Sequence, residues 1–147
     1  MESKRPQTAE IPVTTALREV TEELGVGPLS VSVVGRLPDV RQELNRFVIA
    51  PVVGVLAGET RIAMDLEEIV AVFSVPLATI VSPGAVVLDG EFTKVRGKPM
   101  YVLQHGERRI WGLTARIIKS FVEEWNAPAP SLRDVLLRHL TVQERYA

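Results

Sequence analysis

The stretch that most constrains this chain lies at residues 13–28, where an amphipathic, acidic segment is followed by residues that end helices. Its apolar side chains recur at steps of four, three and four, which predicts the buried stripe of an α-helix over about 11–25: Val13, Leu17, Val20 and Leu24. Gly25 stands where helices often end in a left-handed residue, and Pro28 prevents continuation. The chain must therefore fold around a short helix with one apolar face and one acidic face.

The acidic face carries Glu19, Glu22 and Glu23, whose spacing of i, i+3 and i+4 places them on one side of the helix. Carboxylates gathered in this way repel one another, and Arg18 is positioned to pair with Glu22. Mg²⁺ and Mn²⁺ prefer hard oxygen ligands and complete their coordination shells with water and substrate phosphate. The pattern therefore indicates a metal–diphosphate site in which the metal activates a water molecule. The alternative is an ordinary solvated helix face.

Composition excludes several classes of protein. The chain has 147 residues, enough for one domain with a core, so we expect a single domain over 1–147. A net charge of −1 gives no indication of nucleic-acid binding, and the absence of cysteine removes disulfides and thiol nucleophiles. No apolar stretch is long enough to span a membrane, and the polar first residues do not resemble a secretory signal. We therefore expect a soluble intracellular protein, either cytoplasmic or in an organelle such as a mitochondrion or peroxisome.

Apolar runs separated by glycine and proline predict an α/β or α+β fold. Residues 1–9 are expected to form an irregular arm. Strands are expected at 29–36, 47–56, 58–63, 69–75, 86–88, 92–95, 100–103 and 109–111. Helices are expected at 76–81, 113–125 and 132–140, the last within a C-terminal helical extension over 127–147.

The acidic segment resembles the Nudix box, Gly-x5-Glu-x7-Arg-Glu-U-x-Glu-Glu-x-Gly-U with U a bulky aliphatic residue, and the match runs from Glu10 to Val26. Later blocks are similar to the coenzyme A diphosphatase branch of that superfamily. They are FVIAPVVGVL at 47–56, EIVAVFSVPL at 68–77 and YVLQHGERRIWGLTA at 101–115. The resemblance covers roughly residues 10–125. Within the third block, we interpret Trp111 as a packing residue, with a substrate platform as the alternative.

The resemblance implies a Nudix-type α/β/α sandwich around a mixed β-sheet. It also implies Mg²⁺- or Mn²⁺-dependent hydrolysis of the diphosphate bond of coenzyme A or acyl-CoA, giving 3′,5′-ADP and 4′-phosphopantetheine or its acyl form. The implied metal ligands are Glu19, Glu22, Glu23 and Glu68, the implied catalytic residues are Arg18, Glu19 and Glu22, and Glu10 is an accessory acid. The sequence does not separate Glu68 from Glu67. Arg41 and Arg46 are candidates for binding substrate phosphate.

The chain departs from the family pattern at its N-terminal end. Lys4 stands where the box begins with glycine, and no strand-like run precedes it. A lysine side chain cannot copy the close approach of a glycine backbone. We therefore interpret the chain as an N-terminally truncated Nudix domain. It is then a shortened active enzyme, a degenerate member that binds without cleaving, or a protein that completes its sheet in another way, for instance as a homodimer. A second nucleoside diphosphate derivative, such as ADP-ribose, is the alternative substrate.

Overall fold

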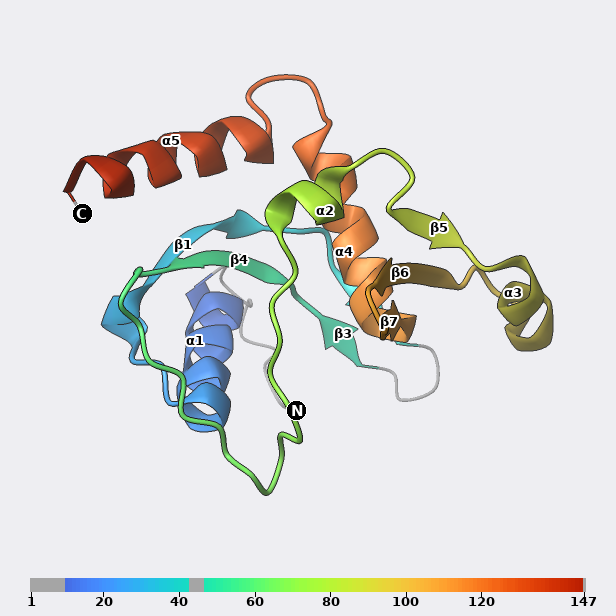
Figure 1. Cartoon of the computed structure of the whole chain (residues 1–147), viewed down its shortest axis with the longest axis horizontal. Helices are drawn as coiled ribbons and strands as arrows, with labels where there is room; N and C mark the ends of the chain where they lie inside the picture. The colour runs from blue at the N-terminus through green and yellow to red at the C-terminus, as the bar shows by residue number, and fades with distance from the viewer. Residues whose placement is uncertain (1–9, 43–46, 147) are drawn as a thin grey trace, which may run out of the picture. The chain divides into compact units, whose positions relative to one another are not determined.

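A computed structural model describes residues 10–42 and 47–146 of the chain (Figure 1). The chain divides into two compact units, Met1–Val72 and Phe73–Ala147. Helices and antiparallel strands occur in both units, which confirms the expected α+β class. The expectation of a single domain over 1–147 stays a prediction. No helix in the described part of the chain is both long and apolar enough to cross a membrane.

The first unit contains the acidic helix and two small sheets. Its elements are α1 (Glu10–Leu24), the short 3-10 helix η1 (Pro28–Ser30), β1 (Val31–Arg36), β2 (Val40–Arg41), β3 (Val48–Ile49) and β4 (Val52–Leu56). β1 pairs with β4 and β2 pairs with β3, each in antiparallel fashion. Helix α1 contacts β4 and η1. Val26, Leu37 and Val40 are buried in this unit.

The expected strand over 47–56 is interrupted at Pro51, which separates β3 from β4. Proline has no N–H to donate to a strand ladder, so continuous pairing cannot pass through it. Its carbonyl oxygen still accepts a hydrogen bond from the backbone N–H of Leu37 at 3.1 Å. The apolar run is therefore used as two short strands that pair with different partners.

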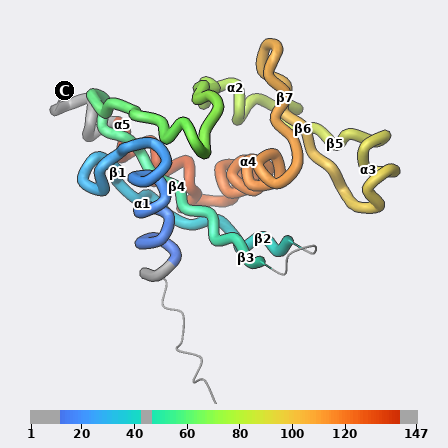
Figure 2. Tube along the Cα trace, turned by 90° about the horizontal axis from the view of Figure 1, so that it is seen from below, coloured from blue at the N-terminus to red at the C-terminus, as the bar shows by residue number. Residues whose placement is uncertain are grey.

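The second unit is built on one antiparallel sheet in the order β5–β6–β7. Its elements are α2 (Leu77–Val81), β5 (Val86–Leu88), α3 (Gly90–Arg96), β6 (Tyr101–His105), β7 (Arg108–Trp111), α4 (Gly112–Trp125) and α5 (Leu132–Tyr146). Helix α4 contacts all three strands, and α5 contacts α4. The buried residues of this unit are Met100, Val102, Leu103, Ala115, Ser131 and Leu136. Figures 1 and 2 both show α3 extending beyond β5 on the side away from α4.

Two expected strands, 58–63 and 69–75, are wrong, because these residues have no regular structure. Backbone N–H and C=O groups need partners, and a strand forms only where another strand supplies them. No strand pairs with either run in the described part of the chain. Val70 is 98% exposed, so its β-branched side chain has no sheet face to cover. Most apolar residues of these runs are exposed instead, among them Ile62, Val72 and Phe73.

The expected strand over 92–95 is also wrong, because these residues belong to α3. The Asp89 side chain caps the start of this helix by accepting a hydrogen bond from the Phe92 N–H at 2.9 Å. At the other end, Gly97 has a φ of +69° and ends the helix in the left-handed conformation. Capping residues at both ends outweigh the strand preference of Phe92 and Val95.

The strands of the described residues pair only in antiparallel fashion. Parallel pairing needs a crossover connection of a dozen or more residues, usually a helix. Here the long connection between β5 and β6 contains α3 but returns the chain antiparallel to β5. The mixed sheet of the expected α/β/α sandwich is therefore not formed among these strands.

Candidate functional site on helix α1

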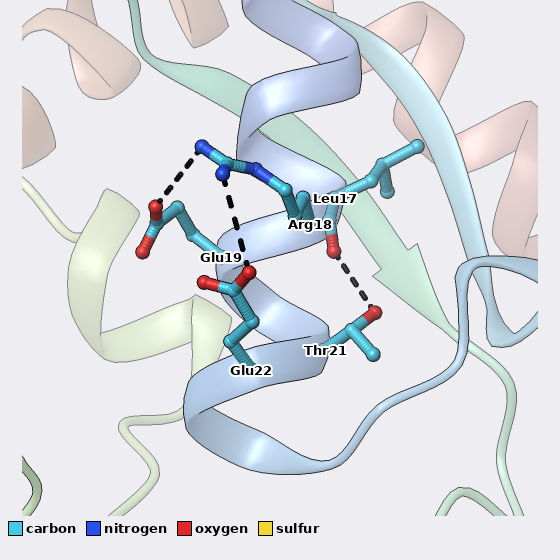
Figure 3. A network of polar contacts seen from close by, with 5 residues as sticks. All are labelled: Leu17, Arg18, Glu19, Thr21 and Glu22. Carbon is cyan, nitrogen blue, oxygen red and sulfur yellow. Dashed lines mark hydrogen bonds and ion pairs between the residues drawn. The ribbon is translucent and has the colours of Figure 1, made fainter.

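Helix α1 brings together Arg18, Glu19 and Glu22 on an exposed face (Figure 3). The Arg18 Nη2 atom lies 3.4 Å from Glu19 Oε1, and its Nη1 atom lies 4.0 Å from Glu22 Oε1. The pairing with Glu22 follows from helix geometry, since residues four apart are neighbours on the helix surface. Glu19 is the next residue in sequence and is contacted by the other guanidinium nitrogen. The guanidinium group is therefore held between two carboxylates.

These ion pairs do little to stabilise the fold. The side chains of Arg18, Glu19 and Glu22 are 61%, 48% and 57% exposed. Ion pairs at this exposure contribute roughly 0–1 kcal/mol, because water screens the charges and ordering the side chains costs entropy. The carboxylate oxygens are consequently open to a ligand from solvent, while Arg18 restricts their positions.

The end of α1 is fixed by contacts that the sequence pattern did not reveal. The Thr21 hydroxyl lies 2.6 Å from the carbonyl oxygen of Val26 and 3.0 Å from that of Leu17, and its one hydrogen is shared between them. Gly25 has a φ of +65°, and a Cβ added there would lie 3.0 Å from the Cβ of Ala63. Glycine is thus required at position 25 both by the backbone conformation and by the close approach of Ala63.

The segment that carries Glu68 is attached to this helix end. The backbone N–H of Ala63 donates to the Leu24 carbonyl oxygen at 2.8 Å, and that of Asp65 donates to the Glu23 carbonyl oxygen at 2.9 Å. The Glu68 N–H then donates to the Asp65 carbonyl oxygen at 3.1 Å. Glu68 therefore lies in a turn tethered to the C-terminal end of α1. Glu67 and Glu68 are both exposed, so both are still candidates for the distal acid.

Of the other predicted site residues, Arg41 lies on a different element, and the side chain of Glu10 and all of Arg46 fall outside the described part of the chain. Helix α1 begins at Glu10, whose side chain is not described, and Arg46 and Lys4 fall outside the described residues. Arg41 is exposed on β2, where its Cα pairs with that of Val48. The structure therefore brings Arg18, Glu19 and Glu22 together on α1.

The fit of this face to a metal ion can be judged from its donors. Within residues 10–42 and 47–146, no three acidic or histidine side chains converge as a metal-binding group. Magnesium, however, commonly takes one or two protein carboxylates and fills the rest of its shell with water and substrate phosphate. The exposed oxygens of Glu19 and Glu22 fit that donor chemistry. The face is thus suited to a hydrated ion that arrives with a phosphorylated ligand.

Comparisons with known proteins support a family assignment. No family model matches the chain. The chain is 35% identical over 107 residues to the uncharacterized Nudix hydrolase NudL of Pectobacterium atrosepticum, covering 72% of this chain and 55% of that protein. It is 29% identical over 107 residues to the NudL proteins of Escherichia coli O7:K1 and Salmonella newport, again covering 73% of this chain and 55% of each relative. The chain thus spans about half the length of the curated relatives it matches. Together with the Nudix box residues on α1, these likenesses support membership of the chain in the Nudix superfamily.

Proposed function

We propose that this chain carries out divalent-metal-dependent hydrolysis of the diphosphate bond of coenzyme A or acyl-CoA, releasing 3′,5′-ADP and 4′-phosphopantetheine or its acyl form. The observation that carries the proposal is the position of Arg18 between the exposed carboxylates of Glu19 and Glu22 on α1. The 35% identity to a protein named as a Nudix hydrolase supports the reaction class. The metal proposed is Mg²⁺ or Mn²⁺.

Each residue of the face has a separate task in this proposal. Glu19, Glu22 and Glu23 provide oxygens for the metal, and Glu68 is the acid supplied from the tethered turn. Arg18 contacts Glu19 and Glu22 and so favours the side-chain conformations in which they face it, which lowers the entropy lost when they bind an ion. The metal, when bound, supplies charge neutralisation of the diphosphate and activation of a water molecule.

Coenzyme A is favoured over other nucleoside diphosphate derivatives by the resemblance of the block at 101–115 to the coenzyme A diphosphatase branch. This block forms β6, β7 and the first turn of α4, so it is a continuous part of the second unit. Its most specific portion, Ile110 to Ala115, spans the end of β7 and the start of α4. Gly112 there has a φ of +67°, which a glycine adopts readily. The block therefore builds a tight strand-to-helix junction.

A second candidate function is nucleotide binding without cleavage. It is favoured by the finding that three acids do not converge on one metal site within residues 10–42 and 47–146. In that case the acidic face of α1 would be retained without a working metal centre. The two candidates differ in one observable, which is product formation.

The test compares coenzyme A with ADP-ribose as substrates in Mg²⁺ or Mn²⁺, with chromatographic separation of the products. We expect 3′,5′-ADP to form from coenzyme A faster than AMP forms from ADP-ribose. Glu23→Gln should remove the activity, whereas Glu59→Gln, an exposed acid on a turn of the same unit, should retain it. Faster cleavage of ADP-ribose would overturn the substrate assignment. No product from either compound, in folded protein, would favour the binding-only candidate.

A further inference from the structure

The second unit contains a hollow of about 390 Å³ between α3 and β7, which we name the α3–β7 hollow. Its lining residues are Asp89, Glu91, Phe92, Arg96, Arg109 and Trp111. Ligand pockets span roughly 300–1,000 Å³, so this hollow has the size of a small-molecule site. It combines aromatic rings with both signs of charge, a composition that packing alone does not require.

One wall of the hollow is a guanidinium group held in a fixed position. Arg109 Nη2 lies 2.7 Å from Asp89 Oδ2, and Asp89 Oδ1 accepts the Phe92 N–H at 2.9 Å. Both carboxylate oxygens of Asp89 therefore have partners, one on β7 and one at the start of α3. The negative charge of Asp89 is balanced within this arrangement, and Arg109 keeps further N–H groups for a ligand.

The hollow is also lined by two aromatic rings, Phe92 on α3 and Trp111 on β7. The rings of Phe92 and Trp111 meet edge to face, with centroids 5.7 Å apart and planes at 74°. The guanidinium carbon of Arg96 lies 5.4 Å from the centre of the Phe92 ring. Phe92 is thus engaged by two neighbours, whereas Trp111 is still 52% exposed. The expected packing role of Trp111 therefore uses only part of its surface.

We propose that the α3–β7 hollow binds a nucleotide, with the base stacked on Trp111 and a phosphate group held by Arg96 and Arg109. An indole face attracts any nucleobase, because stacking does not depend on the hydrogen-bonding edge. Arginine side chains bind phosphate oxygens in bidentate geometry. The exposed carboxylate of Glu91 is available to accept a hydrogen bond from an amino group on the base, which favours adenine over uracil.

The choice of nucleotide rests on the proposed function, since 3′,5′-ADP is the nucleotide portion of coenzyme A. It combines an adenine ring with phosphate groups on the ribose, which are the two features that the hollow can recognise. The hollow lies entirely within the second unit, and its binding can be measured in the full chain without turnover. We therefore expect 3′,5′-ADP to bind in metal-free buffer.

The experiment is a calorimetric titration of the full chain with 3′,5′-ADP in metal-free buffer. Trp111→Leu and Arg96→Gln should each weaken binding by roughly tenfold or more, since base stacking and phosphate contacts contribute on that scale. Trp111→Phe keeps an aromatic face and should bind within about threefold of the unchanged protein. Lys94→Gln removes the same charge from the same helix outside the lining, so it should bind normally.

A spectroscopic measurement separates stacking from a purely structural effect. In Trp125→Phe, Trp111 is the one remaining tryptophan of the two in the chain. Its fluorescence should be quenched when 3′,5′-ADP binds. Arg96→Gln alters an exposed side chain, so its binding result stands if Trp111→Leu fails to fold. Normal binding by Arg96→Gln, or binding without quenching, would overturn the proposal.

The outcomes also separate this inference from the proposed function. Binding that depends on Trp111 and Arg96 supports the α3–β7 hollow even if coenzyme A is not hydrolysed. Hydrolysis of coenzyme A together with unchanged 3′,5′-ADP binding in both variants would overturn the hollow and leave the reaction assignment intact. An absence of 3′,5′-ADP binding in folded protein would also overturn the hollow, whether or not turnover is observed.

Discussion

At the scale of single residues, Arg18 connects sequence pattern to chemistry most directly. Its guanidinium group lies between Glu19 and Glu22, and all three side chains are exposed. Substitution of such a residue should lower activity much more than it lowers the free energy of unfolding. The acidic face can therefore be tested without unfolding the protein.

We expect Arg18→Gln to lower hydrolysis of coenzyme A by roughly 10–100-fold, as for other residues that position metal ligands. The free energy of unfolding should change by less than about 1 kcal/mol, because the broken pairs are exposed. Arg36→Gln breaks the exposed pair between Arg36 Nη2 and Asp39 Oδ1, 3.1 Å apart in the same unit, and serves as the control. Equal activities for these two variants would contradict the positioning role.

Gly25 gives a second test at this scale. Gly25→Ala forces a side chain into a φ of +65° and places its Cβ 3.0 Å from the Cβ of Ala63. The left-handed conformation alone costs roughly 1–2 kcal/mol for a residue other than glycine. Gly27→Ala is the matched control, because its φ is −67° and nothing lies within 4 Å of an added Cβ. Chemical denaturation should show a loss of about 1–3 kcal/mol for Gly25→Ala. Similar stabilities for both variants would rule out a conformational requirement for glycine at position 25.

Part of the candidate site could be predicted from sequence because helix geometry is local. The spacing of Glu19, Glu22 and Glu23 places them on one face, and Arg18 lies one turn from Glu22. The tether from Ala63 and Asp65 to the helix end could not be predicted, since it consists of backbone hydrogen bonds between distant residues. Only Gly25 gave a signal of it, because a glycine stop permits another backbone to approach closely.

At the scale of elements, helices with an apolar stripe were predicted more accurately than short strands. Helices α1 and α4 appear as expected, because their apolar residues repeat over several turns. The runs 69–75 and 92–95 are short, and their apolar content is compatible with more than one structure. The run 69–75 is not a strand because no described strand pairs with it. The run 92–95 is helical because Asp89 and Gly97 cap the two ends of α3. Neither result is readable from apolar content alone.

The start of α5 provides a pH-dependent test of an element. The pKa of Asp134 is lowered chiefly because its carboxylate accepts the Ser131 backbone N–H, at 2.8 Å, and also the Ser131 hydroxyl, at 3.1 Å. A lowered folded-state pKa means that ionised Asp134 stabilises the fold above its unfolded pKa of about 3.9. This contribution is lost as the pH falls through the lower, folded-state value.

We therefore expect backbone amide signals of residues 132–140 to show an acid transition below about pH 4, measured by nuclear magnetic resonance. Asp134→Asn should abolish this transition, because the amide does not ionise in this range. Asp39→Asn, which alters an exposed carboxylate paired with Arg36, should leave it unchanged. Persistence of the same transition in Asp134→Asn would show that another group controls the start of α5.

At the scale of the whole molecule, each compact unit has its own buried residues. Val26, Leu37 and Val40 belong to the first unit, whereas Leu103 and Ala115 belong to the second. Large apolar side chains are also exposed, including Leu29, Leu66 and Val70. Apolar residues that are exposed singly are normal on soluble proteins and do not by themselves mark an interface. The expected homodimer therefore stays a prediction, which sedimentation of the full chain can test.

Leu103→Ala tests whether the chain unfolds as the single domain that its length predicts. Leu103 is 1% exposed, so truncation should cost roughly 2–5 kcal/mol. In a single cooperative domain, hydrogen exchange should accelerate in peptides of α1 and β4 as well as in those of β6 and α4. Leu29→Ala makes the same truncation at an exposed position and should change exchange little. Acceleration confined to the second unit would contradict a single cooperative domain.

The most direct measurement of the central claim is the initial rate of 3′,5′-ADP release from coenzyme A as Mg²⁺ or Mn²⁺ is titrated, in the unchanged chain and in Glu22→Gln. The account predicts turnover that requires the metal and is lost in Glu22→Gln, while both proteins keep the same thermal unfolding temperature without metal. Turnover that is independent of the metal, or equal in the two proteins, would contradict a diphosphatase site on the acidic face of α1.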